Sequence, residues 1–215
     1  MRRRNLALMG VVLLGLFLFA PLGSVRAATI TVTSAVDNAV SGDGLCTLRE
    51  AISNANGDTD SSGGDCAAGS GSDAITFAIG ALGSHQTITL TGNLPTITDP
   101  VVLDGWSQGG IDYTGPPLIE LDGTNLTANS NRGFRITGGG STVRGFIIHS
   151  FNDAGSSAIW LHTADGNWIT SNYIGVNADG TAVLPNHYGI WINNRGNDEP
   201  SHNNIIGTDG DGVDD

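Results

Sequence analysis

Short apolar runs alternate with Gly, Asn, Asp and Pro along the chain from residue 73 onward. Each run is only a few residues long and is rich in β-branched or aromatic side chains, which is typical of short strands. The segment "TITVT" (29–33) has the same alternating pattern. The sequence therefore predicts an all-β chain with strands at 29–33, 75–77, 88–90, 101–103, 119–121, 134–136, 146–148, 159–161, 173–174, 190–192 and 205–206.

The segment "CTLREAISNANG" (46–57) has a helical period instead. Thr47 and Glu50 are three positions apart, which matches a capping box, and Asn-Gly is a common helix end. We therefore predict a short helix at 47–56. Its apolar residues recur at i, i+3, i+4 and i+7 and form one face, made of Leu48, Ala51, Ile52 and Ala55.

Short motifs recur directly along the chain, which favours parallel stacking of successive coils. A β-sandwich is the alternative, but it predicts longer strands and tight hairpin turns between them. In a stack, the helix at 47–56 is expected to cover the open N-terminal end. The repeats are "VLDG" (102–105) and "ELDG" (120–123), 18 residues apart; "GFRI" (133–136), "AIWL" (158–161) and "GIWI" (189–192), 25 and 31 apart; and "SNYIG" (171–175) and "NNIIG" (203–207), 32 apart.

Residues 1–27 are predicted to be an export signal, because a basic start precedes an apolar run and a Val-Arg-Ala site. The alternative is an uncleaved membrane anchor. No later segment is predicted to span a membrane. Cleavage would leave five Arg, no Lys and 21 acidic residues, a formal charge of −16. Such a chain repels phosphate backbones and anionic lipid, so nucleic-acid and membrane-surface binding are not expected.

Cys46 and Cys66 are the only cysteines, and an even count in an exported chain predicts a disulfide. The spacings of His and carboxylate residues around them match no zinc site. The predicted organisation is a signal at 1–27, an N-terminal cap with the helix and disulfide loop at 28–72, and the strand stack at 73–215.

Several segments together resemble exported bacterial proteins that carry a CSLREA-type N-terminal module and a right-handed parallel β-helix of the pectin-lyase type. The resemblance extends over most of residues 28–215, with Thr47 at the Ser position of the motif. It implies a β-helix fold and a secreted or cell-surface location, and it implies no particular activity. In this pattern the last motif should lead into another coil, so the resemblance also predicts a truncated protein or a fragment. The segments are "CTLREAI" (46–52), "LPTITDPVVLDG" (94–105), "PPLIELDG" (116–123), "STVRGFIIHSF" (141–151), "SNYIGVNADGTAVLPN" (171–186) and "NNIIGTD" (203–209).

If the "FRI", "IWL" and "IWI" repeats stack, their central residues point outward while their neighbours fill the core. The outward column would contain Arg135, Trp160 and Trp191, preceded by Glu120. Exposed aromatic rings on adjacent coils often mark binding surfaces and suit the flat faces of sugars. The alternative is that loops cover the two Trp residues or that they belong to the core.

Other polar repeats are interpreted as structural. Asp104 and Asp122 are each followed by Gly at matched repeat positions, which is typical of a turn that closes a coil. Asn172 and Asn204 precede equivalent motifs and are expected to form a hydrogen-bonded ladder. No cluster of carboxylates with a base on neighbouring coils is evident, so no catalysis is predicted. The alternative function is a polysaccharide lyase or glycoside hydrolase of the β-helix class.

No cofactor is predicted to be required, and Ca²⁺ is the one candidate. Asp209, Asp211 and Asp215 lie in a D-x-D-G-x-x-D pattern, whose oxygens at alternate positions suit a hard cation. Asn56, Asp58, Asp60 and Asp65 are similarly spaced in the disulfide loop. The sequence as a whole favours an exported structural or adhesion module that binds glycans or other surface proteins.

Overall fold

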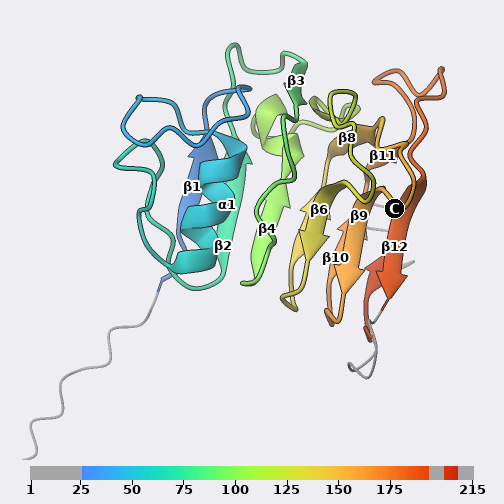
Figure 1. Ribbon diagram of the computed structural model, residues 1–215. Helices are drawn as coiled ribbons and strands as arrows, with labels where there is room; N and C mark the ends of the chain where they lie inside the picture. The colour runs from blue at the N-terminus through green and yellow to red at the C-terminus, as the bar shows by residue number, and fades with distance from the viewer. Residues whose placement is uncertain (1–25, 194–200, 208–215) are drawn as a thin grey trace, which may run out of the picture.

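The protein consists mainly of short strands in parallel sheets, with little helix, so the predicted all-β class is confirmed (Figure 1). A computed structural model describes residues 26–193 and 201–207. Every pairing between named strands in these ranges is parallel. None of the helices found there is long and apolar enough to cross a bilayer.

The strands of the described residues form three sheets, here called sheets A, B and C. Sheet A contains β1 (Thr29–Val32), β2 (Asp73–Phe77), β4 (Val101–Asp104), β7 (Thr142–Arg144), β10 (Trp168–Thr170) and β13 (Ile205–Ile206). Sheet B contains β3 (Gln86–Thr89), β5 (Ile119–Asp122), β8 (Phe146–His149) and β11 (Tyr173–Ile174). Sheet C contains β6 (Arg132–Ile136), β9 (Ser157–His162) and β12 (Tyr188–Asn193).

From β4 onward, the chain enters sheets A, B and C in turn and then begins the next circuit. Each strand therefore pairs with the strand one circuit later, and strands that are consecutive in sequence lie in different sheets. This order explains why short motifs recur directly along the sequence.

Apolar residues that point inward align in register through each sheet. Leu103 of β4 pairs with Val143 of β7, which pairs with Ile169 of β10, and all three are buried. The three sheets meet at a cluster of buried aromatic rings, because Phe146 packs edge-on against Phe77 and Phe134. The alternation of inward and outward residues therefore places one row of side chains in the core and one row on the surface.

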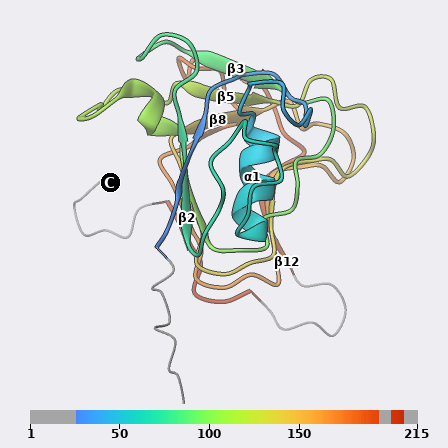
Figure 2. The same ribbon diagram turned by 90° about the vertical axis from the view of Figure 1, so that its left-hand side faces the viewer.

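The predicted helix is present as α1 (Leu48–Gly57). Thr47 and Glu50 form the capping box, since each side chain bonds the backbone N–H of the other residue. Viewed from the N-terminal end, α1 lies over the stacked strands (Figure 2) and packs against β1 and β2. Its predicted apolar face is buried in the same core as these strands, and consists of Leu48, Ala51, Ile52 and Ala55.

The predicted disulfide joins Cys46 to Cys66, with 4.8 Å between their Cα atoms. It connects the residue before the helix N-cap to the loop that follows the helix. The Asp65 carboxylate holds the same region by accepting hydrogen bonds from the backbone N–H groups of Gly42, Asp43 and Gly44. The bridge and these bonds fix the loop beside α1.

Reduction of this disulfide is expected to lower the free energy of unfolding by about 3 kcal/mol, because the bridge restricts a loop of roughly 20 residues in the unfolded chain. Urea unfolding with and without reductant measures the difference. The matched control is the Cys46→Ser/Cys66→Ser double variant, whose stability should not respond to reductant. An unchanged unfolding midpoint for the reduced wild-type protein would contradict the prediction.

Two strands were not predicted, and two of the three repeat alignments are wrong. β7 and β10 were missed because each contains a single inward apolar residue between outward-facing ones. Asp104 and Asp122 are not at matched positions: Asp104 aligns with Arg144 in sheet A, and Asp122 aligns with His149 in sheet B. The 18-residue interval is a step from one sheet to the next within a circuit.

The expected ladder between Asn172 and Asn204 is also wrong. Asn204 instead accepts a hydrogen bond from the side-chain amide of Asn167, at 3.0 Å, and Asn167 accepts one from the backbone of Ser141. Asn172 lies at a different corner, where its amide donates to Val143. "SNYIG" leads into sheet B, whereas "NNIIG" leads into sheet A. The two motifs are therefore similar turns at two different corners of the stack.

Candidate functional site

The outward face of sheet C carries the predicted column of Arg135, Trp160 and Trp191. Arg135 of β6 aligns with Trp160 of β9, and Trp160 aligns with Trp191 of β12. The two indole rings are stacked, with centroids 5.2 Å apart and planes inclined by 16°. Both are half-buried, so they belong neither to the core nor to a freely exposed surface.

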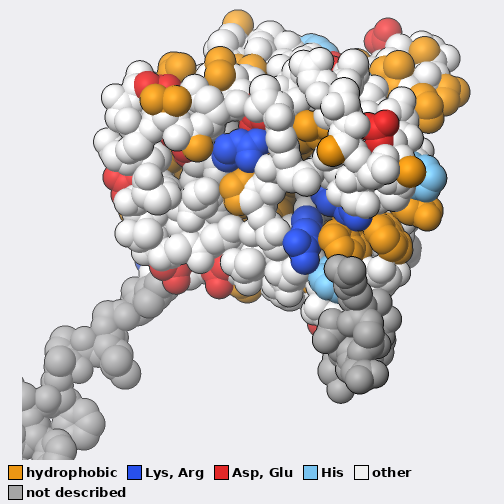
Figure 3. Space-filling view, viewed as in Figure 1, with side chains coloured by type: hydrophobic (Ala, Val, Ile, Leu, Met, Phe, Trp, Pro, Cys, Tyr) orange, Lys and Arg blue, Asp and Glu red, His pale blue; other side chains and the backbone are white. Residues whose placement is uncertain are grey.

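Two guanidinium groups lie over these rings. Arg135 lies 4.8 Å from the centre of Trp160, and Arg132 lies 4.5 Å from Trp160 and 5.1 Å from Trp191. Arg132 is held there by hydrogen bonds from its Nη1 to the carbonyl oxygens of Asn131 and Gly155. Figure 3 shows Arg side chains beside hydrophobic ones over β6, β9 and β12. The strands thus place two cations against two indole rings.

Polar neighbours fix the orientation of Trp160. Its indole N–H donates to the side-chain oxygen of Asn193 at 2.6 Å, and its ring stacks on His162 at 4.7 Å. Tyr188 packs against Trp191 at 5.1 Å. We call this surface the sheet C platform, defined by Arg132, Arg135, Trp160, His162, Trp191 and Asn193.

The platform concentrates positive charge in an acidic protein whose formal net charge is −12. Within residues 26–193 and 201–207, neither Arg132 nor Arg135 forms an ion pair with a carboxylate. Burial lowers the pKa of Arg132, and the nearby charge of Arg135 lowers it further. The surroundings of Arg132 therefore disfavour its positive charge, which a bound anion would stabilise.

Glu120 does not belong to this column, contrary to the sequence-based interpretation. It lies on β5 of sheet B, where its carboxylate bonds Nε2 of His149 and lies 2.9 Å from Nε2 of His85. Thr87 donates a further hydrogen bond at 2.9 Å. The column was assembled from similar three-residue strands, and the "IEL" strand of sheet B resembles those of sheet C.

Arg132, His162 and Asn193 were not identified from the sequence. His162 and Asn193 follow Trp160 and Trp191 by two positions, so strand alternation places them on the same face and was the available signal. Arg132 reaches the rings through its long side chain, and strand alternation does not encode such a contact. The sequence pattern therefore predicted the row of Trp rings and Arg135, but it did not predict the other polar side chains that contact these rings.

The principal calcium candidates, Asp209, Asp211 and Asp215, lie outside the described residues. The carboxylates of the disulfide loop are engaged separately: Asp58 accepts from the backbone of Gly71, and Asp60 from Ser62. In the part of the chain that the structure describes, no three His, Cys, Asp or Glu side chains are grouped as metal ligands.

No model of a known protein family matches the chain, and no curated protein matches it.

Proposed function

We propose that the three-sheet stack is a right-handed parallel β-helix of an exported, surface-associated protein. The order in which the chain passes through sheets A, B and C supports this proposal, as does the resemblance to exported CSLREA-type proteins. The disulfide adds support, because disulfides persist outside the reducing cytosol. A stack of this kind presents repeated surface positions, which suits an adhesion or structural module.

We propose further that the sheet C platform binds an acidic polysaccharide. The main support is that Arg132 and Arg135 lie over Trp160 without a carboxylate partner among the described residues. The half-buried stack of indole rings offers an apolar surface to a sugar ring, and guanidinium groups bind carboxylates or sulfates through charge-assisted hydrogen bonds. A uronate or sulfated sugar has both features in one unit.

The platform is arranged before a ligand arrives, because its parts already hold one another. The Asn193 side chain fixes the Trp160 indole, and backbone carbonyls fix the Arg132 guanidinium. Such preorganisation reduces the entropy lost on binding. Arg135 supplies the donors for the ligand, because it is half-buried, whereas Arg132 is only 7% exposed. The Arg135 guanidinium has five N–H groups and forms no side-chain hydrogen bond within the described residues.

The Trp191→Ala and Arg135→Gln variants are each expected to weaken binding of polygalacturonate or alginate about tenfold or more, since truncated aromatic and Arg anchors commonly cost over 1 kcal/mol. Isothermal titration calorimetry measures the affinities. Trp168→Ala, which alters an exposed Trp on sheet A, is the matched control and should bind as wild type does.

Wild-type binding should also weaken as the salt concentration rises, because the contacts are ionic. Equal affinity in wild type and both platform variants would contradict the proposal. Incubation with the same polymers tests the alternative function: unsaturated uronides or new reducing ends would support a polysaccharide lyase or glycoside hydrolase.

A further inference from the structure

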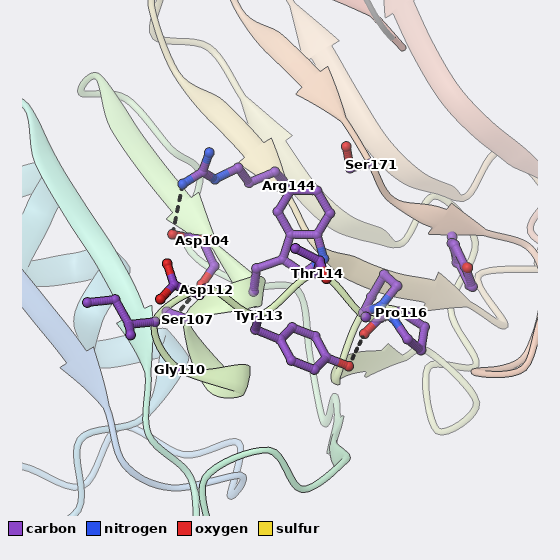
Figure 4. A pocket seen from close by; sticks show the side chains of 14 residues that line it. Asp104, Ser107, Gly110, Asp112, Tyr113, Thr114, Pro116, Arg144 and Ser171 are labelled. Atoms are coloured by element: carbon purple, nitrogen blue, oxygen red, sulfur yellow. Dashed lines mark hydrogen bonds and ion pairs between the residues drawn. The ribbon is translucent and has the colours of Figure 1, made fainter. Parts of the chain in front are cut away.

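A concave site lies on sheet A, on a different surface from the sheet C platform. The segment from the short helix η1 (Gly105–Gly109) to Pro117 projects at the end of β4 and forms one wall of a cleft of about 800 Å³ (Figure 4). A side chamber of about 250 Å³ shares Trp106 and Arg144 with it and extends along outward-facing residues of β4, β7 and β10. Pockets of about 300–1,000 Å³ accommodate small organic ligands.

Aromatic rings line both parts of this cleft. Trp106, Tyr113 and Tyr173 line the main chamber, while Trp106 and Trp168 line the side chamber. Trp168 and Tyr173 are each 36% exposed, so a ligand can reach their rings. The chain has four Trp residues, of which two belong to this cleft and two to the sheet C platform.

The loop that carries Tyr113 is closely fitted to its ring. The Tyr113 hydroxyl donates to the carbonyl oxygen of Pro116 at 2.8 Å. A Cβ atom added at Gly109 would lie 2.1 Å from the Tyr113 ring, and one at Gly115 would lie 2.4 Å from its hydroxyl. A side chain at either position would displace the Tyr113 ring, so the two glycines allow the loop to fit closely around it.

An Arg–Asp pair supplies hydrogen-bonding groups on the cleft surface. Arg144 Nη2 lies 3.0 Å from Asp104 Oδ2, and the two side chains point toward each other (Figure 4). The Arg144 side chain is 36% exposed, and the bond to Asp104 is its one side-chain hydrogen bond within the described residues. Donors and an acceptor thus lie side by side, as the neighbouring hydroxyls of a pyranose require.

The charges that line the cleft distinguish its ligand from that of the platform. Asp104 and Asp112 oppose a single cation, Arg144, so the lining disfavours an anion. We propose that the cleft binds a neutral oligosaccharide, with its sugar rings against Trp106 and Trp168 and its hydroxyls on the Arg144–Asp104 pair.

The test is to titrate the full chain with cellohexaose, xylohexaose and mannohexaose, following heat release and tryptophan fluorescence. At least one of these neutral hexasaccharides should bind wild type and perturb the Trp emission. Trp106→Ala and, independently, Trp168→Ala should each reduce its affinity about tenfold or more, as expected for aromatic anchors. Trp168→Ala leaves the η1 segment unchanged, so it tests the cleft even if Trp106→Ala folds poorly.

Trp191→Ala serves as the matched control and should bind the neutral hexasaccharide as wild type does. Polygalacturonate, titrated in parallel, should bind Trp168→Ala as it binds wild type and should bind Trp191→Ala more weakly. The two proposed sites are thereby tested separately. The cleft proposal is overturned if none of the three hexasaccharides binds at millimolar concentration. It is equally overturned if binding persists unchanged in both cleft variants or is lost only in Trp191→Ala.

Discussion

The Ile52→Asp variant is expected to be about 3–5 kcal/mol less stable than wild type, because it places an uncompensated charge in a buried position. Ile52 is 1% exposed and lies on the face of α1 that packs into the core beside β1 and β2. Detachment of the helix would uncover those core residues and the end of the strand stack. We therefore also expect Ile52→Asp to form oligomers, measurable by light scattering, and to unfold at a lower urea concentration.

Ser53→Asp is the matched control for this prediction, since it introduces the same side chain at the next position of α1. Ser53 is half-buried and its hydroxyl bonds the carbonyl of Arg49, so the substitution leaves the apolar face intact. Its loss of stability should be about 1 kcal/mol or less, because the substitution removes one hydrogen bond to a backbone carbonyl and no buried apolar contact. If both variants lose the same stability, the apolar face of α1 does not have the role assigned to it.

Phe146→Ala is expected to cost about 3–5 kcal/mol of unfolding free energy, the range measured for truncation of buried aromatic residues. Phe146 is fully buried on β8 of sheet B. Its ring packs edge-on against Phe77 of sheet A at 5.4 Å and against Phe134 of sheet C at 5.2 Å. The cavity would therefore remove contacts among all three sheets, and thermal or urea unfolding would measure the loss.

Phe146→Met should lose much less than Phe146→Ala, because a flexible side chain of similar volume fills most of the space. Val183→Ala provides a surface reference: Val183 is 76% exposed, so the substitution should change stability by at most about 0.5 kcal/mol. A loss below about 1 kcal/mol for Phe146→Ala would show that the three sheets do not depend on this cluster.

Most strands were predictable from short apolar runs in the sequence, whereas β7 and β10 were not. The run "FII" at the start of β8 is evident, and β8 lies where it was expected. In β7 and β10, Val143 and Ile169 are the single buried apolar residues, and their neighbours resemble loop residues. Their burial becomes evident only once the strands of the adjacent circuits are aligned beside them.

The repeat period was harder to predict than the presence of repeats. "GFRI", "AIWL" and "GIWI" were aligned correctly, because Phe134 pairs with Ile159 and Ile159 with Ile190. "VLDG" and "ELDG" were aligned wrongly, because strand ends in sheets A and B have the same Asp-Gly chemistry. A short motif indicates the type of turn at its own position. The number of residues in one full circuit depends instead on loop lengths, which vary along the chain.

In the candidate sites too, features set by strand alternation were predictable from the sequence, whereas features set by tertiary contacts were not. Strand alternation predicted the row of Arg135, Trp160 and Trp191, whereas the approach of Arg132 depends on a long side chain folding back over the rings. The sheet A cleft was not predicted. Its walls come from η1 and from strands of successive circuits, and Trp106 and Trp168 are far apart in sequence.

The register of sheet C has an evolutionary consequence. Neighbouring strands of a sheet are about 4.8 Å apart, so each circuit adds one position to the row of outward side chains at a constant step. Duplication of a single circuit in the gene would lengthen that row by one ring and leave the other rings in place. Deletion would shorten it equally cleanly. The number of positions in such a row would therefore change by one for each circuit that the gene gains or loses.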